Sequence, residues 1–236
     1  MNRDNRFLKV LVFVCVVIVV TLGVATTAFG WSEGVDTNGS GTHDWILNTA
    51  NTLAGGWVNM TVAQPVSDDP DTIYNDTMNH IYDVWGLLRM GTAPTAVKTH
   101  YLAAVTYLKA KNVDSASREV ALMAHYYGDI WNPWHTSYEF STLGAQALYH
   151  SRYEADVLTH EPAVPVYTPV LVSDAAAATV TAAGTSRNYY STLANAYTSR
   201  RGYAGPGVDS TTKDMLTRAA KGLANLIYSV KLNAGY

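Results

Sequence analysis

The sequence predicts an all-α protein in which several helices, joined by long loops, form a single domain. Apolar residues recur at helical spacing along most of the chain, no alternating run of useful strand length occurs, and no internal repeat divides the sequence. The 236 residues are 48% hydrophobic and only 15% charged. This composition suffices for one sizeable core and is untypical of a disordered chain.

The first thirty residues have the pattern of a signal peptide. Three basic residues precede a wholly apolar run over 10–20, and small residues follow as far as Gly30. This order predicts cleavage before Trp31 and therefore a secreted protein. The alternative is an uncleaved membrane anchor formed by residues 8–28, although the apolar stretch is slightly short for a membrane-spanning helix.

The predicted division is thus a signal peptide over 1–30 and one helical domain over 31–236. The first helix of that domain is expected to begin at Trp45 and to end before Gly55. Residues 61–76 are acidic and contain proline, so we expect a loop there. The remaining helices are expected over 95–110, 115–130, 142–158, 174–198 and 209–232. Asp114 or Ser115 is expected to cap the helix over 115–130.

Charge and cysteine content narrow the range of functions. With 16 basic and 19 acidic residues the chain has no surplus of positive charge, which disfavours binding of duplex nucleic acid through its phosphates. The single cysteine, Cys15, lies in the predicted signal peptide, so the mature chain forms no disulfide and no cysteine-based zinc site. Any metal ion must therefore be held by His, Asp or Glu.

Two His–carboxylate pairs stand at helical spacing. His125 and Asp129 are four residues apart on one expected helix, and His150 and Glu154 repeat this spacing on the next. His135 lies between them, just after a proline turn. One such pair is more often a solvated or hydrogen-bonded pair, but two pairs with a His between them favour a metal site. Imidazole and carboxylate ligands suit zinc, and open positions filled by water make such a site hydrolytic.

These residues stand in segments that resemble the bacterial zinc-dependent phospholipases C, a family that includes the catalytic domain of clostridial alpha-toxin. The family's HYxGDxxxPxH segment is matched by HYYGDIWNPWH (125–135), and its HSxxE by HSRYE (150–154). The family's Tyr-Pro-Asp … His-Phe-Tyr-Asp segment resembles SDDPDTIYNDTMNHIYD (67–83), and an N-terminal ligand segment resembles THDWI (42–46). The matches run in order over most of residues 31–160.

The resemblance implies three zinc ions per chain, with the helices and long loops arranged around this trinuclear site. One ion would be held by His135, His150 and Glu154, a second by Asp71, His80, His125 and Asp129, and the third by the amine and carbonyl of Trp31, His43 and Asp129 as a bridge. If the signal peptide stayed uncleaved, the Trp31 amine would be an amide and the third ion would lose this ligand.

Asp71 has competitors within its own loop. It is preferred because Pro70–Asp71 matches the family's Pro-Asp dipeptide, and Asp68 and Asp69 are the alternatives. As a ligand at this position, Asp71 would also hold or deprotonate the attacking water. Four further side chains are expected to lie outside the ligand set: His100 and His160 at the surface or at helix ends, and Trp131 and Trp134 as packing residues or as an apolar wall beside the site.

The function implied by the resemblance is that of a secreted phospholipase C. A metal-activated hydroxide would hydrolyse the phosphodiester of a phospholipid to diacylglycerol and a phosphorylated head group, with peripheral contact to a membrane surface. The alternative is a zinc-dependent single-strand nuclease or 3′-nucleotidase, from a related family with a similar site. That family begins its mature chain with Trp-Gly and ends its ligand set with Asp, whereas this chain has Trp31-Ser32 and Glu154. These differences favour the lipase; the head-group preference stays open.

Overall fold

The structure is a computed structural model. It describes residues 41–236 apart from 75, 86–88 and 139–142. For residues 143–147 it describes the backbone alone. The predicted signal peptide and Trp31 lie outside the described residues. Within the described part the chain is helical, and the one β-type pairing there is an isolated bridge between Asp83 and Met90. The predicted all-α class is confirmed.

Eight α-helices lie in the described part of the chain. They are α2 (Thr42–Leu53), α3 (Met60–Ala63), α4 (Ala93–Lys109), α5 (Val113–Ile130), α6 (Leu143–Val157), α7 (Ala175–Arg187), α8 (Tyr190–Thr198) and α9 (Val208–Asn233). Shorter helical turns join them: η1 (Gln64–Val66), η2 (Pro70–Tyr74), η3 (Thr77–Asn79), η4 (Pro133–His135) and η5 (Gly202–Ala204). None of the described helices is long and apolar enough to cross a membrane.

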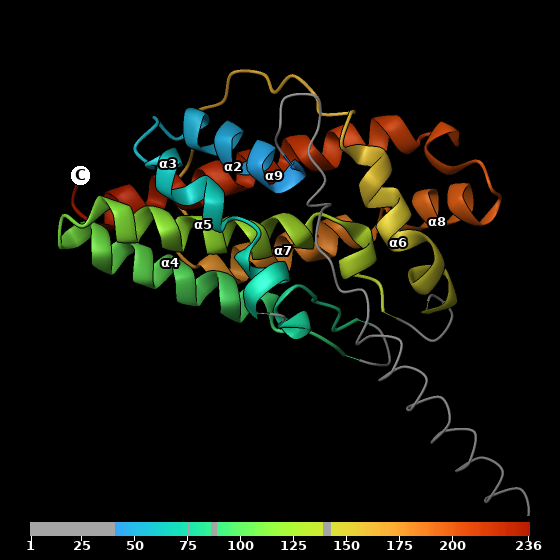
Figure 1. The fold of residues 1–236 in the computed structure, drawn as a ribbon, viewed down its shortest axis with the longest axis horizontal. Helices are drawn as coiled ribbons and strands as arrows, with labels where there is room; N and C mark the ends of the chain where they lie inside the picture. Colours follow the sequence, from blue (N-terminus) through green and yellow to red (C-terminus); the bar gives the residue numbers. More distant parts are fainter. Residues whose placement is uncertain (1–40, 75, 86–88, 139–142) are drawn as a thin grey trace, which may run out of the picture.

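Helix α5 lies at the centre of this arrangement. Figure 1 shows α4 and α5 side by side, with α2 and α9 together on the other side of α5 and with α6 and α8 at one end. Every residue of α5 from Val120 to Ile130 is buried, whereas most residues of its first two turns are not. A helix that is buried all round belongs in the interior, so the polar residues on the last turns of α5 lie in the core.

One glycine lets α9 come close to α5. A Cβ on Gly222 would lie 2.1 Å from the Tyr127 hydroxyl oxygen, so no larger residue fits there without a shift. Trp131 and Trp134 are both buried, and Trp134 packs edge to face against Tyr190. The expectation that these tryptophans serve packing is confirmed.

The expectations for residues 61–76 and for the cap of α5 are wrong. The loop expected over 61–76 contains α3 and the turns η1 and η2; Pro65 stands in the first turn of η1, where its fixed φ suits a helical start. The cap of α5 is neither Asp114 nor Ser115 but Asn112, whose side-chain oxygen accepts a hydrogen bond from the Ser115 backbone N–H at 3.0 Å.

The helix expected over 174–198 is two helices, α7 and α8, which are separated at Asn188 and Tyr189. The Asn188 side chain donates a hydrogen bond to the Gly184 carbonyl. Such local side-chain bonds compete with the continuation of a helix. The remaining helices lie within a few residues of their expected positions.

Candidate metal centre

Helix α5 brings His125 and Asp129 to the core on one face. Both side chains are fully buried. The His125 Nδ1–H donates to the Ser67 carbonyl at 2.6 Å, because a carbonyl can only accept. This hydrogen bond places a proton on Nδ1 and turns Nε2 toward Asp129 and Asp71.

The first group of candidate ligands joins α5 to the segment that follows η1. Asp71 places Oδ1 3.4 Å from His80 Nδ1 and Oδ2 3.4 Å from His125 Nε2. The Asp129 Oδ2 atom lies 2.8 Å from His80 Nδ1 and 3.4 Å from His125 Nε2. Ligand atoms of Asp71, His80 and His125 therefore lie within 4.8 Å of one another, and Asp129 contacts both histidines.

Of the three neighbouring aspartates, Asp71 is the one in this group. Asp69 pairs instead with Arg118, whose Nη2 lies 2.9 Å from Asp69 Oδ2. Asp68 belongs to none of the candidate metal groups among the described residues. The geometry thus favours the Pro-Asp position over both alternatives.

The second group is centred on the other oxygen of Asp129. His43 comes from α2, and its Nε2 lies 3.3 Å from Asp129 Oδ1. Its ring stacks on that of His125 with a centroid distance of 3.9 Å. Asp129 therefore faces His43 with one oxygen and the first group with the other, as a bridging carboxylate would. Trp31, the expected further ligand here, lies outside the described residues.

The third group lies where η4 meets α6. His135 Nε2 and His150 Nε2 are 3.0 Å apart, and Glu154 Oε1 is 3.4 Å from the first and 2.7 Å from the second. The one-turn spacing of His150 and Glu154 on α6 sets both on the same face. The Asn132 side-chain amide donates a hydrogen bond to Glu154 Oε1 at 2.8 Å and so holds this carboxylate in place.

Burial controls the charge of this third group. It lowers the pKa of His150 to about 4 and, against the attraction of Asp129, lowers the pKa of His135 well below its ordinary value. Both imidazoles are therefore neutral near pH 7 and keep the lone pairs that metal ligands need. Burial, with the charges of Asp129 and Asp71, raises the pKa of Glu154 well above its ordinary value.

Near Asp129 the balance is different. Burial favours the neutral carboxyl, but the surrounding imidazoles, His125 first, hold the pKa of Asp129 well below its ordinary range. Burial lowers the pKa of His80, yet hydrogen bonds to Asp129 and Asp76 outweigh it and raise that pKa to about 10. Asp129 is therefore ionised near pH 7 and pairs with the His80 imidazolium, whose Nδ1 proton a bound cation would displace.

The donor set fits zinc. The ligand atoms lie within 4.8 Å of one another in three sets of residues: His43, His125 and Asp129; Asp71, His80 and His125; and His135, His150 and Glu154. The donors are only imidazole nitrogens and carboxylate oxygens. Bonds of about 2.0–2.1 Å around a tetrahedral zinc ion place neighbouring ligand atoms about 3.3–3.4 Å apart. The separations between ligand atoms run from 2.7 to 3.4 Å, and five of the eight are 3.3–3.4 Å.

The sequence interpretation missed the residues that support the ligands. Asp76 accepts a hydrogen bond from His80 Nε2 at 3.0 Å, and Asn132 holds Glu154. Both lie inside segments that resemble the phospholipase family. The spacing of four residues between Asp76 and His80 was a usable signal, whereas the contact of Asn132 requires the fold.

The two histidines expected outside the ligand set do lie outside it. His160 follows the end of α6 and stacks on Tyr203 at 3.8 Å, as expected of a helix-end residue. His100 lies within α4, half-buried, and its Nδ1 is 2.7 Å from Glu119 Oε2 on α5. His100 is therefore not at a helix end; its partly exposed side chain points toward α5.

The described residues thus define an all-α protein with a buried candidate centre for several metal ions. Its fold is found among solved structures. The alpha-toxin of Clostridium perfringens, isolated from avian strain SWCP, matches with a TM-score of 0.58 and 16% identity, over 92% of this chain and 63% of that one. The alpha toxin from Clostridium absonum matches with a TM-score of 0.60 and 15% identity, over 93% and 64% respectively. No protein-family model and no curated protein sequence matches the chain.

The fold expected from the sequence resemblance is therefore confirmed. At 15–16% identity the likeness shows the fold alone. The chain spans slightly less than two thirds of the length of these toxins.

Proposed function

We propose that this chain is a secreted, zinc-dependent phospholipase C that hydrolyses the phosphodiester of a phospholipid to diacylglycerol and a phosphorylated head group. One observation carries the proposal: three buried His–carboxylate groups, two of them joined through Asp129, lie in an alpha-toxin-type fold. The sequence order of these groups is that of the phospholipase family which the chain resembles.

Three zinc ions are proposed, one for each group. His135, His150 and Glu154 would hold one ion, and Asp71, His80, His125 and Asp129 a second; His43, Asp129 and the Trp31 amine and carbonyl would hold the third. When bound, zinc ions lower the pKa of a coordinated water and offset negative charge on phosphoryl oxygens. In a water-poor interior these effects are larger than in solvent.

The chain's own groups orient the reaction. Asp129 keeps the two groups that it joins at a fixed separation, since its oxygens face His43 on one side and His80 on the other. Asp71 is proposed to accept the proton of the attacking water, because its carboxylate closes the first group and is a base of suitable reach.

Exposed apolar side chains over residues 73–85 also indicate how the chain would contact a lipid surface. Ile73, Tyr74, Met78 and Trp85 are exposed large apolar side chains, and they flank Asp71 and His80 in the sequence. Apolar and aromatic side chains of this kind favour the lipid–water boundary. We propose peripheral membrane contact through this segment, which would bring a lipid phosphate near the site.

The nuclease or 3′-nucleotidase function is the alternative. The same exposed aromatics, Tyr74 and Trp85, are side chains on which single-stranded bases stack. The experiment therefore has to offer both classes of substrate.

The test is a hydrolysis assay on the purified mature chain. It is offered phosphatidylcholine and other phospholipids as vesicles, single-stranded DNA and a 3′-nucleotide, each with and without a chelator. Chelator-sensitive release of diacylglycerol is expected. Chelator-sensitive cleavage of DNA or nucleotide would assign the nuclease function instead, and a zinc-loaded chain that hydrolyses none of the substrates would overturn the proposal.

Two variants sharpen this assay. Glu154→Gln should abolish hydrolysis, whereas Glu119→Gln, which alters a His-paired carboxylate outside the three groups, should leave it unchanged. For the membrane contact, Trp85→Ala should slow hydrolysis of vesicles but not of monomeric short-chain phospholipid. Val166→Ser changes a fully exposed apolar residue elsewhere and serves as its control.

A further inference from the structure

Asp76 lies on the far side of His80 from the candidate centre. Its Oδ1 accepts a hydrogen bond from His80 Nε2 at 3.0 Å, while His80 Nδ1 lies 2.8 Å from Asp129 Oδ2. The imidazole is thus held between two carboxylates, one in the centre and one outside it.

His80 differs from the other described histidines of the three groups. Each of those presents Nε2 to its neighbours in the centre, whereas His80 presents Nδ1. A neutral imidazole has one N–H and one lone pair, so it binds a cation through Nδ1 only when the proton is on Nε2. An acceptor placed at Nε2 selects that tautomer.

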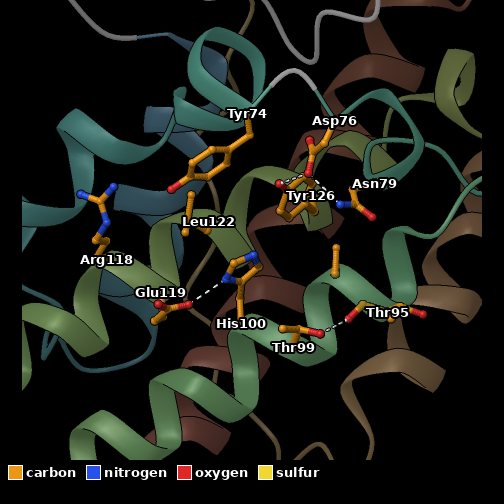
Figure 2. Close-up of a pocket in the computed structure, with 11 residues that line it drawn as sticks. Tyr74, Asp76, Asn79, Thr95, Thr99, His100, Arg118, Glu119, Leu122 and Tyr126 are labelled. Atoms are coloured by element: carbon orange, nitrogen blue, oxygen red, sulfur yellow. Dashed lines mark hydrogen bonds and ion pairs between the residues drawn. The ribbon is translucent and has the colours of Figure 1, made fainter.

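Asp76 is itself held in place. Its second oxygen, Oδ2, accepts from the Tyr126 hydroxyl at 2.7 Å and from the Asn79 side-chain amide at 2.7 Å. Oδ1 is thereby left facing His80. Figure 2 shows Asp76, Tyr126 and Asn79 gathered at one side of a cavity of about 430 Å³ between α4, α5 and the turns η2 and η3.

We propose that Asp76 is a positioning residue for metal binding: with Tyr126 behind it, Asp76 fixes the tautomer and ring orientation in which His80 binds an ion. The inference rests on the metal-binding part of the proposed function and is independent of the substrate. Outer partners of metal-bound histidines typically change metal affinity by about 10–100-fold when they are removed.

The same cavity contains a matched control. Glu119 Oε2 lies 2.7 Å from His100 Nδ1, which makes a second His–carboxylate pair, and His100 stacks on Tyr126. His100 belongs to none of the three groups. Glu119→Gln therefore makes the same chemical change as Asp76→Asn in the same cavity, without touching a candidate ligand.

The test is zinc binding by the full mature chain, followed by competition with a chromophoric chelator and by elemental analysis. Asp76→Ala is expected to weaken one of the bound ions by about 10–100-fold. Asp76→Asn should have a smaller effect, because the amide oxygen still accepts from Nε2–H but carries no charge. Tyr126→Phe should also weaken binding, by less than Asp76→Ala, and Glu119→Gln should bind zinc as the wild type does.

Thermal unfolding in excess chelator separates positioning from a purely structural role. A structural role would lower the melting temperature of the chelated Asp76 variants while leaving zinc affinity intact. As a direct readout, ¹⁵N spectra of histidine-labelled, zinc-loaded protein should show His80 protonated at Nε2, and this signature should weaken in Asp76→Ala.

The outcomes distinguish this inference from the proposed function. A wild-type chain that binds no zinc overturns both. A wild-type chain that binds zinc, with unchanged affinity in Asp76→Asn and Asp76→Ala, overturns the positioning role alone. Equal loss in Glu119→Gln also overturns it, because the effect would then belong to the cavity and not to His80. Asp76→Asn and Tyr126→Phe preserve volume, so they remain informative if Asp76→Ala does not fold.

Discussion

Replacement of Asp129 by asparagine tests the bridge on which the proposed centre depends. The Asp129 side chain is fully buried, with Oδ1 3.3 Å from His43 Nε2 and Oδ2 2.8 Å from His80 Nδ1. Asparagine has nearly the same size, but one of its two terminal atoms is an NH₂ group that cannot be a ligand. Asp129→Asn can therefore offer a lone pair to one side of the bridge but not to both.

The size of the effect follows from the number of ions involved. An ion that binds only the folded chain at a free concentration of about 100 times its Kd stabilises that chain by about 2.7 kcal/mol. In a chain of this length, 1 kcal/mol shifts the melting temperature by about 2–4 °C. Loss of one ion should therefore lower the melting temperature in zinc by about 5–11 °C. Loss of both bridged ions should about double this.

The assay combines metal content with thermal unfolding in zinc and in excess chelator. The readout is the difference between these two melting temperatures, because it excludes any effect of the substitution on the metal-free protein. Asp114→Asn, an exposed change in the first turn of the same helix, is the control and should keep full metal content. Hydrolytic activity of Asp129→Asn should fall by orders of magnitude. Full metal content together with an unchanged zinc-dependent shift in Asp129→Asn would refute the bridging role.

Three further predictions concern the surrounding structure. Arg187→Met should lower the free energy of unfolding by about 3–5 kcal/mol in denaturant titrations, because it removes the cation 2.7 Å from the fully buried Asp83 carboxylate. An unchanged value would show that the Trp85 and Tyr138 backbone N–H groups, which donate to Asp83, suffice to stabilise its charge. Gly222→Ala should cost about 1–3 kcal/mol through its collision with the Tyr127 hydroxyl, and Tyr127→Phe in the same chain should recover part of that loss; strictly additive effects would contradict this contact. In excess chelator, the free energy of unfolding should fall as the pH falls from 6.5 to about 4, because the unfolded chain takes up the proton that folded His150, with its pKa of about 4, does not. His150→Gln should reduce that slope in urea titrations, and equal slopes in the two proteins would argue against the lowered pKa.

The parts of the centre that the residues alone predicted are those set by helical geometry. A spacing of four residues puts His125 beside Asp129 and His150 beside Glu154 wherever a helix forms, so these pairs needed no knowledge of the fold. His43 comes from a different helix, and its contact with Asp129 depends on how α2 packs. The residues between them carry no signal for that contact, and only the resemblance to a family suggested it.

The errors have a different physical origin. Turns of three to five residues such as η1 and η2 are too short to show a period, so the sequence over 61–76 appears to be loop although it is helical in places. The cap of α5 depends on which side chain reaches an unpaired N–H group, and Asn112, Asp114 and Ser115 are all suitable residue types. Composition cannot choose among them, whereas the geometry selects Asn112.

Because the candidate centre is buried, the packing that stabilises the fold also positions the candidate ligands. His125 and Asp129 are polar groups in the most buried stretch of α5, where unpaired polar groups cost several kcal/mol. Tyr127 lies between them in the sequence and meets α9 at Gly222. The packing that admits α9 therefore also fixes the helix that carries Asp129, the proposed bridging carboxylate. A substitution at Gly222 should lower zinc affinity as well as stability, because it displaces Tyr127, which lies between His125 and Asp129 on α5.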